Sequence, residues 1–234
     1  AEKYKQDIIV NHRNSKYAEI LLDPTTVSKE KQNSNQIYER LYLDFNEQKY
    51  IQVIDESNKY ILDFNGEPIV PKLEFLKALA IARVYGFKEY EKALTFIKLN
   101  YSTTLEGKEA ELILDEVLPA IKNDNFKNNK MSDNYKIIYQ FPMGLNDEIS
   151  SQINDLKKYI DNIDYLDLRV SKDYYNNIIT FVVVHGLKSY DGSLGLSERL
   201  EKTIDIQADS FFVVSSDNYK TIQIHKNLDK FENK

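Results

Sequence analysis

The stretch FVVVHGLKSYDGSLGLSERL, residues 181–200, joins a hydrophobic run to a turn containing glycines and then to a helical pattern. The run that ends at Gly186 is apolar on both faces, which predicts a strand in the middle of a sheet. Gly186, Gly192 and Gly195 are spaced G-x5-G-x2-G, which fits neither the dinucleotide fingerprint nor the P-loop. These glycines therefore predict a turn that shapes the fold, and not a phosphate site.

Strand and helix patterns alternate on both sides of this stretch. The order is β-α-β-β-α-β, which predicts an α+β domain with a ferredoxin-like sheet and both helices on one side. A further strand is expected at the end, after a tight turn at Asp217-Asn218. The expected strands are 134–142, 164–171, 176–186, 210–216 and 218–227, and the expected helices are 147–163 and 192–203.

The first half of the chain has a helical period. Apolar residues recur at spacings of three and four, Pro71 suits the first turn of one helix, Gly86 suits its end, and Pro119 is expected to stop the last helix. Short connections predict antiparallel helical hairpins, which resemble tetratricopeptide repeats; a non-repeat helical bundle is the alternative. The expected helices are 35–45, 48–64, 70–86, 88–101 and 106–121.

These patterns predict two domains. A helical repeat domain spans 1–124, the polar, asparagine-rich segment 125–133 is the linker, and the α+β domain spans 134–234.

The composition excludes several classes of protein. A net charge of −6 argues against a nucleic-acid-binding protein. No apolar run is long enough to span a bilayer, and the absence of cysteine removes disulfides and thiolate chemistry. No segment at the start reads as a signal peptide and the first residue is Ala1, so we expect a mature or trimmed fragment of a longer protein.

Candidate chemistry is sparse. The three histidines are His12, His185 and His225, and none belongs to a metal-binding pattern such as H-x-x-H or H-E-x-x-H. His185 and His225 fall at expected strand ends, so they are candidates to approach each other. No serine nucleophile motif is present. The sequence therefore predicts a protein that is not an enzyme and that has no cofactor and no metal.

A binding surface is the remaining expectation. The helices of the sheet domain are expected to cover Tyr135, Ile137, Tyr139, Phe181 and Val183. The opposite face is apolar at its centre, and such a face is normally covered or used for binding. Its cover would be either the helical half of the chain or a separate protein. The residues predicted for partner binding are Lys136, Ile138, Gln140, Thr180, Val182 and Val184.

Two family resemblances follow from these blocks. The segments 135–160 and 180–200 resemble the sporulation-related repeat (SPOR-like) fold, which implies peptidoglycan binding as an alternative function. Nearly the whole chain resembles the C-terminal part of the SprE/PorW family, tetratricopeptide lipoproteins of type IX secretion and gliding motility in Bacteroidetes. The segments that carry this broader resemblance are 14–24, 70–101, 106–119, 181–189 and 211–228.

The broader resemblance implies a non-catalytic scaffold in the periplasm. Its partners would be other proteins of the secretion and motility complex, with peptidoglycan as a further partner under the alternative function, but no nucleic acid. Family members are held at the outer membrane by an N-terminal lipid anchor, which would lie outside this chain.

Overall fold

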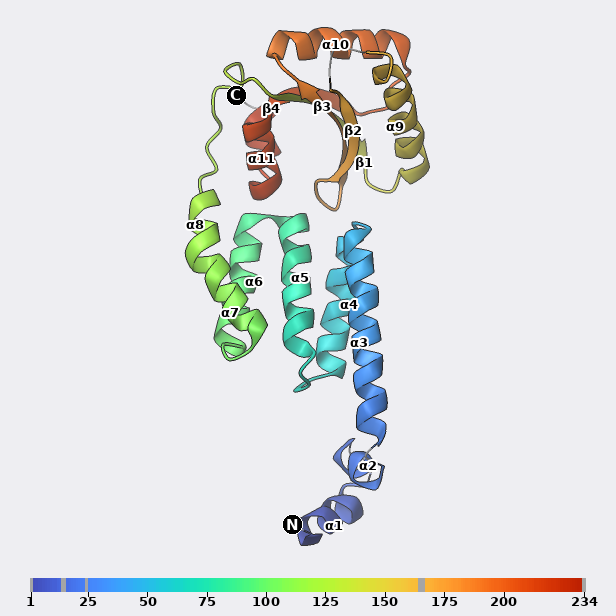
Figure 1. Ribbon diagram of the computed structural model, residues 1–234, viewed down its shortest axis with the longest axis vertical. Coiled ribbons are helices and arrows are strands. Elements are labelled where there is room, and N and C mark those ends of the chain that lie inside the picture. Colours follow the sequence, from blue (N-terminus) through green and yellow to red (C-terminus); the bar gives the residue numbers. More distant parts are fainter. Residues whose placement is uncertain (1, 14–15, 24, 164–166, 233–234) are drawn as a thin grey trace. The chain divides into compact units, whose positions relative to one another are not determined.

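The computed structural model describes residues 2–13, 16–23, 25–163 and 167–232 and shows a protein of mixed helix and sheet (Figure 1). The chain divides into two compact units, residues 1–76 and 77–234. The division falls inside helix α5, Val70–Tyr85, and the segment 125–133 lies within the second unit.

Unit 1 is built from helices. The helices α3, Thr25–Asn46, and α4, Tyr50–Asp63, pack as a hairpin in which Leu41 and Val53 are fully buried. Arg40 binds Glu56 across this hairpin, and it also binds Asp44 one turn along its own helix. Before the start of α5 the helices are α1 Glu2–Asn11, α2 Lys16–Leu22, α3 Thr25–Asn46 and α4 Tyr50–Asp63.

Unit 2 begins with the rest of α5 and a second helical hairpin. Thr104 caps the second helix of the hairpin by accepting a hydrogen bond from Gly107 N at 3.1 Å. A Cβ at Gly107 would lie 1.9 Å from Tyr101 O, so only glycine fits this close turn. The elements are α6 Phe87–Asn100, α7 Leu105–Leu112, the π-helical turn η1 Ile113–Val117 and α8 Leu118–Ile121.

The last helix ends at Ile121 as expected, but the prediction that Pro119 stops it is wrong. Helical structure continues past Pro119 to Ile121, and a π-helical turn precedes the proline. A proline inside an α-helix clashes with the carbonyl four residues earlier and has no N–H to donate. The wider π turn relieves this conflict and lets the helix continue.

The sheet has the element order that the sequence predicts. The four strands lie in the order β2-β3-β1-β4, and all neighbouring pairs are antiparallel. The strand β2 begins later than expected, and Leu166 of the expected strand lies outside the described residues. The elements are β1 Tyr135–Pro142, α9 Asn146–Ile160, β2 Arg169–Tyr174, β3 Ile179–Leu187, α10 Tyr190–Thr203 and β4 Ser210–Ser215.

The prediction of a final strand over 218–227 is wrong, because this segment is the helix α11, Ser216–His225, followed by α12, Leu228–Glu232. Ser215 caps α11 by accepting from Asn218 N. The buried residues Tyr219 and Ile222 are three positions apart, which is a helical spacing. The same segment also alternates polar and apolar residues, so its sequence fits both periods.

Helices cover both faces of the sheet. In Figure 1 the sheet curves around α11, while α9 and α10 lie on its outer side. The core under α9 and α10 includes Tyr139, Val182 and Val184. The core under α11 and α12 includes Ile138 and Val183.

The two faces of β3 are the reverse of the prediction: Val182 and Val184 face α9 and α10, whereas Phe181 and Val183 face α11 and α12. Tyr139 pairs with Val182, and Ile137 pairs with Val184, so these residues share one face. The register between β1 and β3 shifts beside Gly186, which has a φ of +92°. A Cβ there would lie 2.1 Å from the carbonyl oxygen of Asp167, so this bulge requires glycine.

The predicted linker is bound along β4. The side chain of Asn129 donates to Val213 O at 2.9 Å and accepts from Ser215 N at 2.8 Å, much as a neighbouring strand would. Lys127 N donates to Asn218 Oδ1 at 2.9 Å. The segment 125–133 is thus held to the sheet and to α11.

Candidate functional site

The six residues predicted for partner binding do not form an open surface. Thr180, Val182 and Val184 are buried, as is Ile138, and Gln140 is buried with its Nε2 donating to Glu232 Oε1 of α12 at 3.0 Å. The prediction of an open sheet face is wrong because α11 and α12 fill it. Lys136 alone of the six is only half-buried.

Lys136 belongs to a polar network on the face that α11 covers. Lys136 Nζ lies 3.0 Å from His185 Nδ1, and His185 Nε2 lies 2.8 Å from Ser171 Oγ. Ser171 Oγ donates to Asp173 Oδ1 at 2.7 Å. The hydroxyl of Tyr219, on α11, donates to Asp173 Oδ2 at 2.6 Å. The network therefore joins β1, β3 and β2 to the covering helix.

The donors in this network have one consistent direction. A lysine ammonium only donates, so Nδ1 of His185 accepts and its proton is on Nε2. Nε2 then donates to Ser171, whose own hydroxyl proton goes to Asp173. The hydrogen bonds from Lys136 through His185 and Ser171 all run toward the carboxylate of Asp173, and His185 is neutral.

Burial and charge set the acidity of these groups. Burial lowers the pKa of His185 to about 4, and the charge of Lys136 lowers it further in the same direction. Burial also lowers the pKa of Lys136, with Arg169 as the next cause. The pKa of Tyr219 is raised by burial and then by Asp173. The shifts of the His185 and Tyr219 pKa values favour the neutral forms that the hydrogen-bond directions require, whereas the shift of Lys136 makes its ammonium form less stable than that of a lysine in water.

The network lacks the arrangement of a serine hydrolase. In a catalytic triad a carboxylate orients the histidine and stabilises its protonated form, and the histidine accepts the serine proton. Here a lysine occupies the carboxylate's place beside His185, and Ser171 donates to Asp173 instead of to the histidine. Ser171 is therefore not activated, and the network orders β2 and α11 on the sheet.

The other histidines lie elsewhere. His225, at the end of α11, packs against Phe87 with ring centroids 5.2 Å apart and the rings tilted by 33°, and its Nε2 donates to Ile121 O at 3.0 Å. His185 and His225 thus have separate partners and do not form the pair considered from the sequence. Within residues 2–13, 16–23, 25–163 and 167–232, no three His, Asp or Glu side chains are grouped as metal ligands.

A half-buried lysine follows α11. Lys226 has a φ of 52°, and its ammonium donates to Gln223 Oε1 at 3.1 Å and lies 5.0 Å from the ring centre of Tyr175. Burial, and next the charge of Arg83, lowers the pKa of Lys226 to about 7. A Cβ at Gly86 would lie 2.8 Å from Lys226 Cγ, so the α5–α6 turn closes over this side chain.

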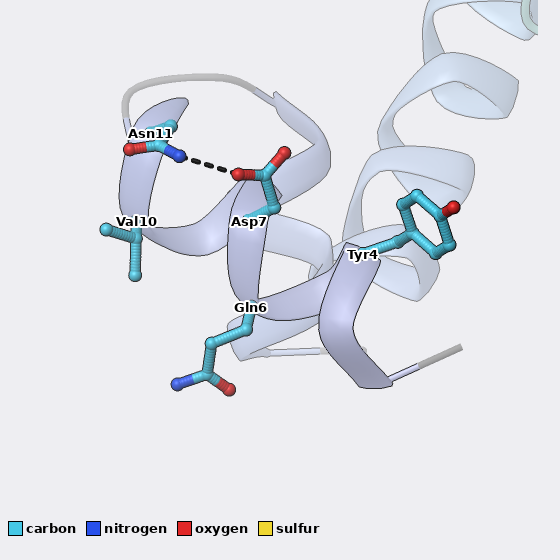
Figure 2. Close-up of a pocket in the computed structure, with 5 residues that line it drawn as sticks. All are labelled: Tyr4, Gln6, Asp7, Val10 and Asn11. Carbon is cyan, nitrogen blue, oxygen red and sulfur yellow. Dashed lines mark hydrogen bonds between the residues drawn. The ribbon is translucent and has the colours of Figure 1, made fainter.

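The surface hollow beside α1 contains little chemistry. Figure 2 shows side chains of α1 around it, and Asn11 Nδ2 donates to Asp7 Oδ1 at 2.6 Å. Both residues are exposed, so water competes for any ligand that they would bind. The residues drawn are Tyr4, Gln6, Asp7, Val10 and Asn11.

The α6–α7 hairpin exposes large apolar side chains. On α6, Phe96 and Leu99 are 47% and 74% exposed and are three positions apart. On α7, Leu105 and Leu112 are 80% and 47% exposed and are seven positions apart. At these spacings each pair lies on one side of its helix. The hairpin therefore presents two short apolar rows to solvent.

Comparisons with known proteins give no match. No protein-family model matches the chain, and no curated protein matches it. Across the described part of the chain, none of the helices has the length and apolar character needed to cross a bilayer.

Sequence reasoning missed three members of the polar network. Ser171, Asp173 and Tyr219 are far apart from Lys136 and His185 in sequence, and only the strand register and α11 bring them together. The available signal was the alternation of Ser171 and Asp173 with Val170, which places both polar side chains on the same face of β2.

Proposed function

We propose that this chain is a non-catalytic adaptor that binds a partner protein through the outer surface of the α6–α7 hairpin. The observation that carries the proposal is the pair of apolar rows, Phe96 with Leu99 and Leu105 with Leu112, that the hairpin exposes. Grouped apolar side chains on a surface are typical of protein-binding sites. Both faces of the sheet are already covered by helices of the same chain, so the hairpin is the better candidate.

The family resemblance supports a particular setting for this adaptor. The tetratricopeptide-like hairpins suit a docking role, because stacked helical repeats offer extended surfaces for protein partners. The resemblance to the SprE/PorW family makes the adaptor a periplasmic subunit of the type IX secretion and gliding machinery. It would be held at the outer membrane by a lipid anchor and would bind other proteins of that complex.

Peptidoglycan binding is the weaker alternative. The SPOR-like resemblance implies a glycan site on the sheet face away from the two crossover helices. In this chain that face carries Ile138 and Val183, which are fully buried beneath α11 and α12. A glycan strand would have to displace both helices, so the covered face counts against this function.

Charge placed on the hairpin tests the adaptor proposal. We expect the double variant Leu99→Glu/Leu105→Glu to fold normally, because both side chains are exposed, and to lose capture of its partner from periplasmic extracts together with protein secretion. Leu62→Glu is the matched control, because Leu62 is 77% exposed on α4. Normal capture and secretion by the double variant would refute the proposal.

A further inference from the structure

We propose that Arg169 and Lys136, placed on either side of His185, form a binding site for a single carboxylate, supplied by an acidic side chain of a peptide partner. This site uses residues different from those of the apolar rows on the hairpin, so the two proposals can fail independently. The carboxylate would belong to the partner protein of the proposed adaptor, so the identity of the ligand rests on that function.

The three residues form a row across neighbouring strands. Arg169 on β2 pairs with His185 on β3, which places their side chains side by side on one face of the sheet. Lys136 on β1 continues the row, with its Nζ 3.0 Å from His185 Nδ1. The ring of Tyr219 lies beside Lys136, with 5.6 Å between Nζ and the ring centre. Two cationic side chains are therefore held in one line with a neutral imidazole between them.

A single carboxylate, that of Asp173, offsets only part of the positive charge of this row. The nearest acidic group of the network, Asp173, already accepts hydrogen bonds from Ser171 at 2.7 Å and from Tyr219 at 2.6 Å. Among the residues that the structure describes, no ion pair is found for Lys136 or Arg169. The two cations and the one carboxylate leave a single positive charge, on a chain whose net charge is −6.

The half-burial of Lys136 makes this charge more effective. A partly buried ion pair is less screened by water and salt than one on the open surface. Arg169 is exposed and supplies a planar fork of donors that matches the two oxygens of a carboxylate. Lys136 has two further N–H donors beyond the one directed at His185. An anion in front of the row would thus receive donors from both sides.

The charge balance favours a carboxylate over a phosphate. One negative charge neutralises the row, and a doubly charged phosphate would be repelled by Asp173 more strongly than a singly charged carboxylate would. His185 directs its proton to Ser171 and so offers no donor for extra phosphate oxygens. These features select a singly charged ligand, such as a glutamate or aspartate side chain.

NMR titration of the complete chain tests the site. The probe is the capped tripeptide acetyl-Ala-Glu-Ala-amide, and its glutamine analogue and inorganic phosphate are the comparisons. We expect the glutamate peptide to shift the amide signals of residues 136, 169 and 185 saturably, and the glutamine peptide to leave them unchanged. The variant Arg169→Gln should weaken binding about tenfold, since a charge-assisted hydrogen bond has that order of effect.

Lys172→Gln is the matched control, because it removes one positive charge from the same strand but on the other face, where Lys172 Nζ donates to Asn146 Oδ1. It should bind the glutamate peptide as the unmodified chain does. Three results would overturn the proposal: absence of saturable shifts, equal responses to the glutamate and glutamine peptides, or equal effects of the two substitutions. Tighter binding of phosphate than of the glutamate peptide would overturn the assignment of the ligand.

Discussion

Replacing Ile222 by alanine tests whether α11 covers the sheet. The side chain of Ile222 is fully buried in the cluster that contains Phe181, Val183 and Val214. Shortening a buried isoleucine to alanine costs about 2–5 kcal/mol, partly from lost burial and partly from the cavity that remains. Because α11 is a single helix that can move toward the sheet, we expect a loss of about 3 kcal/mol in the free energy of unfolding of unit 2.

Urea unfolding measures this loss. The chain has no tryptophan and has 17 tyrosines, so far-UV circular dichroism and tyrosine fluorescence are suitable signals. With a urea dependence of about 1–3 kcal/mol per molar, the midpoint should fall by roughly 1–3 M. Hydrogen exchange at the amides of Val183 and Val214 should show the same loss within the sheet.

Lys220→Ala is the control for this variant, because Lys220 lies on the same helix but is exposed. It should change the free energy of unfolding by less than about 0.5 kcal/mol. If Ile222→Ala and Lys220→Ala have equal effects, the segment does not pack on the sheet as a helix, and the covered face is refuted.

Three other predictions test the bulge, the bound linker and the polar network. Gly186→Ala should cost at least about 3 kcal/mol in unfolding free energy, because the new Cβ meets a backbone carbonyl at positive φ. Gly195→Ala is the control, because Gly195 faces open space within α10, and it should be neutral or stabilising by up to about 1 kcal/mol. Similar urea midpoints for the two variants would contradict this prediction. Asn129→Ala should lower the free energy of unfolding by about 1–3 kcal/mol, because it leaves two backbone groups of β4 without their partner. Asn128→Ala, at an exposed turn, is the control and should lower the free energy of unfolding by less than about 0.5 kcal/mol. An equal loss in the two variants would show that the linker is not held to β4. The pKa of His185 is about 4 in the folded chain and near 6.5 in the unfolded chain. Between these pH values the unfolded chain binds more protons than the folded chain does. The free energy of unfolding should therefore fall as the pH is lowered across this window, by at most about 1.4 kcal/mol per pH unit. His185→Gln should flatten that part of the profile, and an unchanged pH dependence of the urea midpoint would contradict the role assigned to this histidine.

The sequence predicts best the elements whose ends carry local signals. Pro71 lies in the first turn of α5 and Gly86 follows its last residue, as expected. The β-α-β-β-α-β order also follows from the change between helical and strand periods. In each case one period fits much better than the other, so the local pattern is decisive.

The errors occur where two periods fit equally or where register decides. The segment of Tyr219 and Ile222 satisfies both a strand and a helix, and the cap by Ser215 together with the uncovered sheet face decides for the helix. On β3, consecutive valines are apolar on both faces, so alternation cannot show which valine faces which helix. The bulge at Gly186 sets that register, and its position depends on pairing with β1.

The candidate site was only partly visible for the same reason. Lys136 and His185 were both singled out from the sequence, but as members of different features. Their contact depends on strand order, and the roles of Asp173 and Tyr219 depend on β2 and α11. Residues joined by register and by a covering helix have no common signal in one sequence.

The most direct test of the adaptor is photocrosslinking in living cells, with a photoreactive residue in place of Leu105. Position 62 is the control, because its leucine is almost as exposed as Leu105 but lies on α4. The account predicts a discrete adduct with a partner protein at position 105 and none at position 62. Equal adducts at both positions, or no adduct at position 105 in cells that secrete normally, would contradict it.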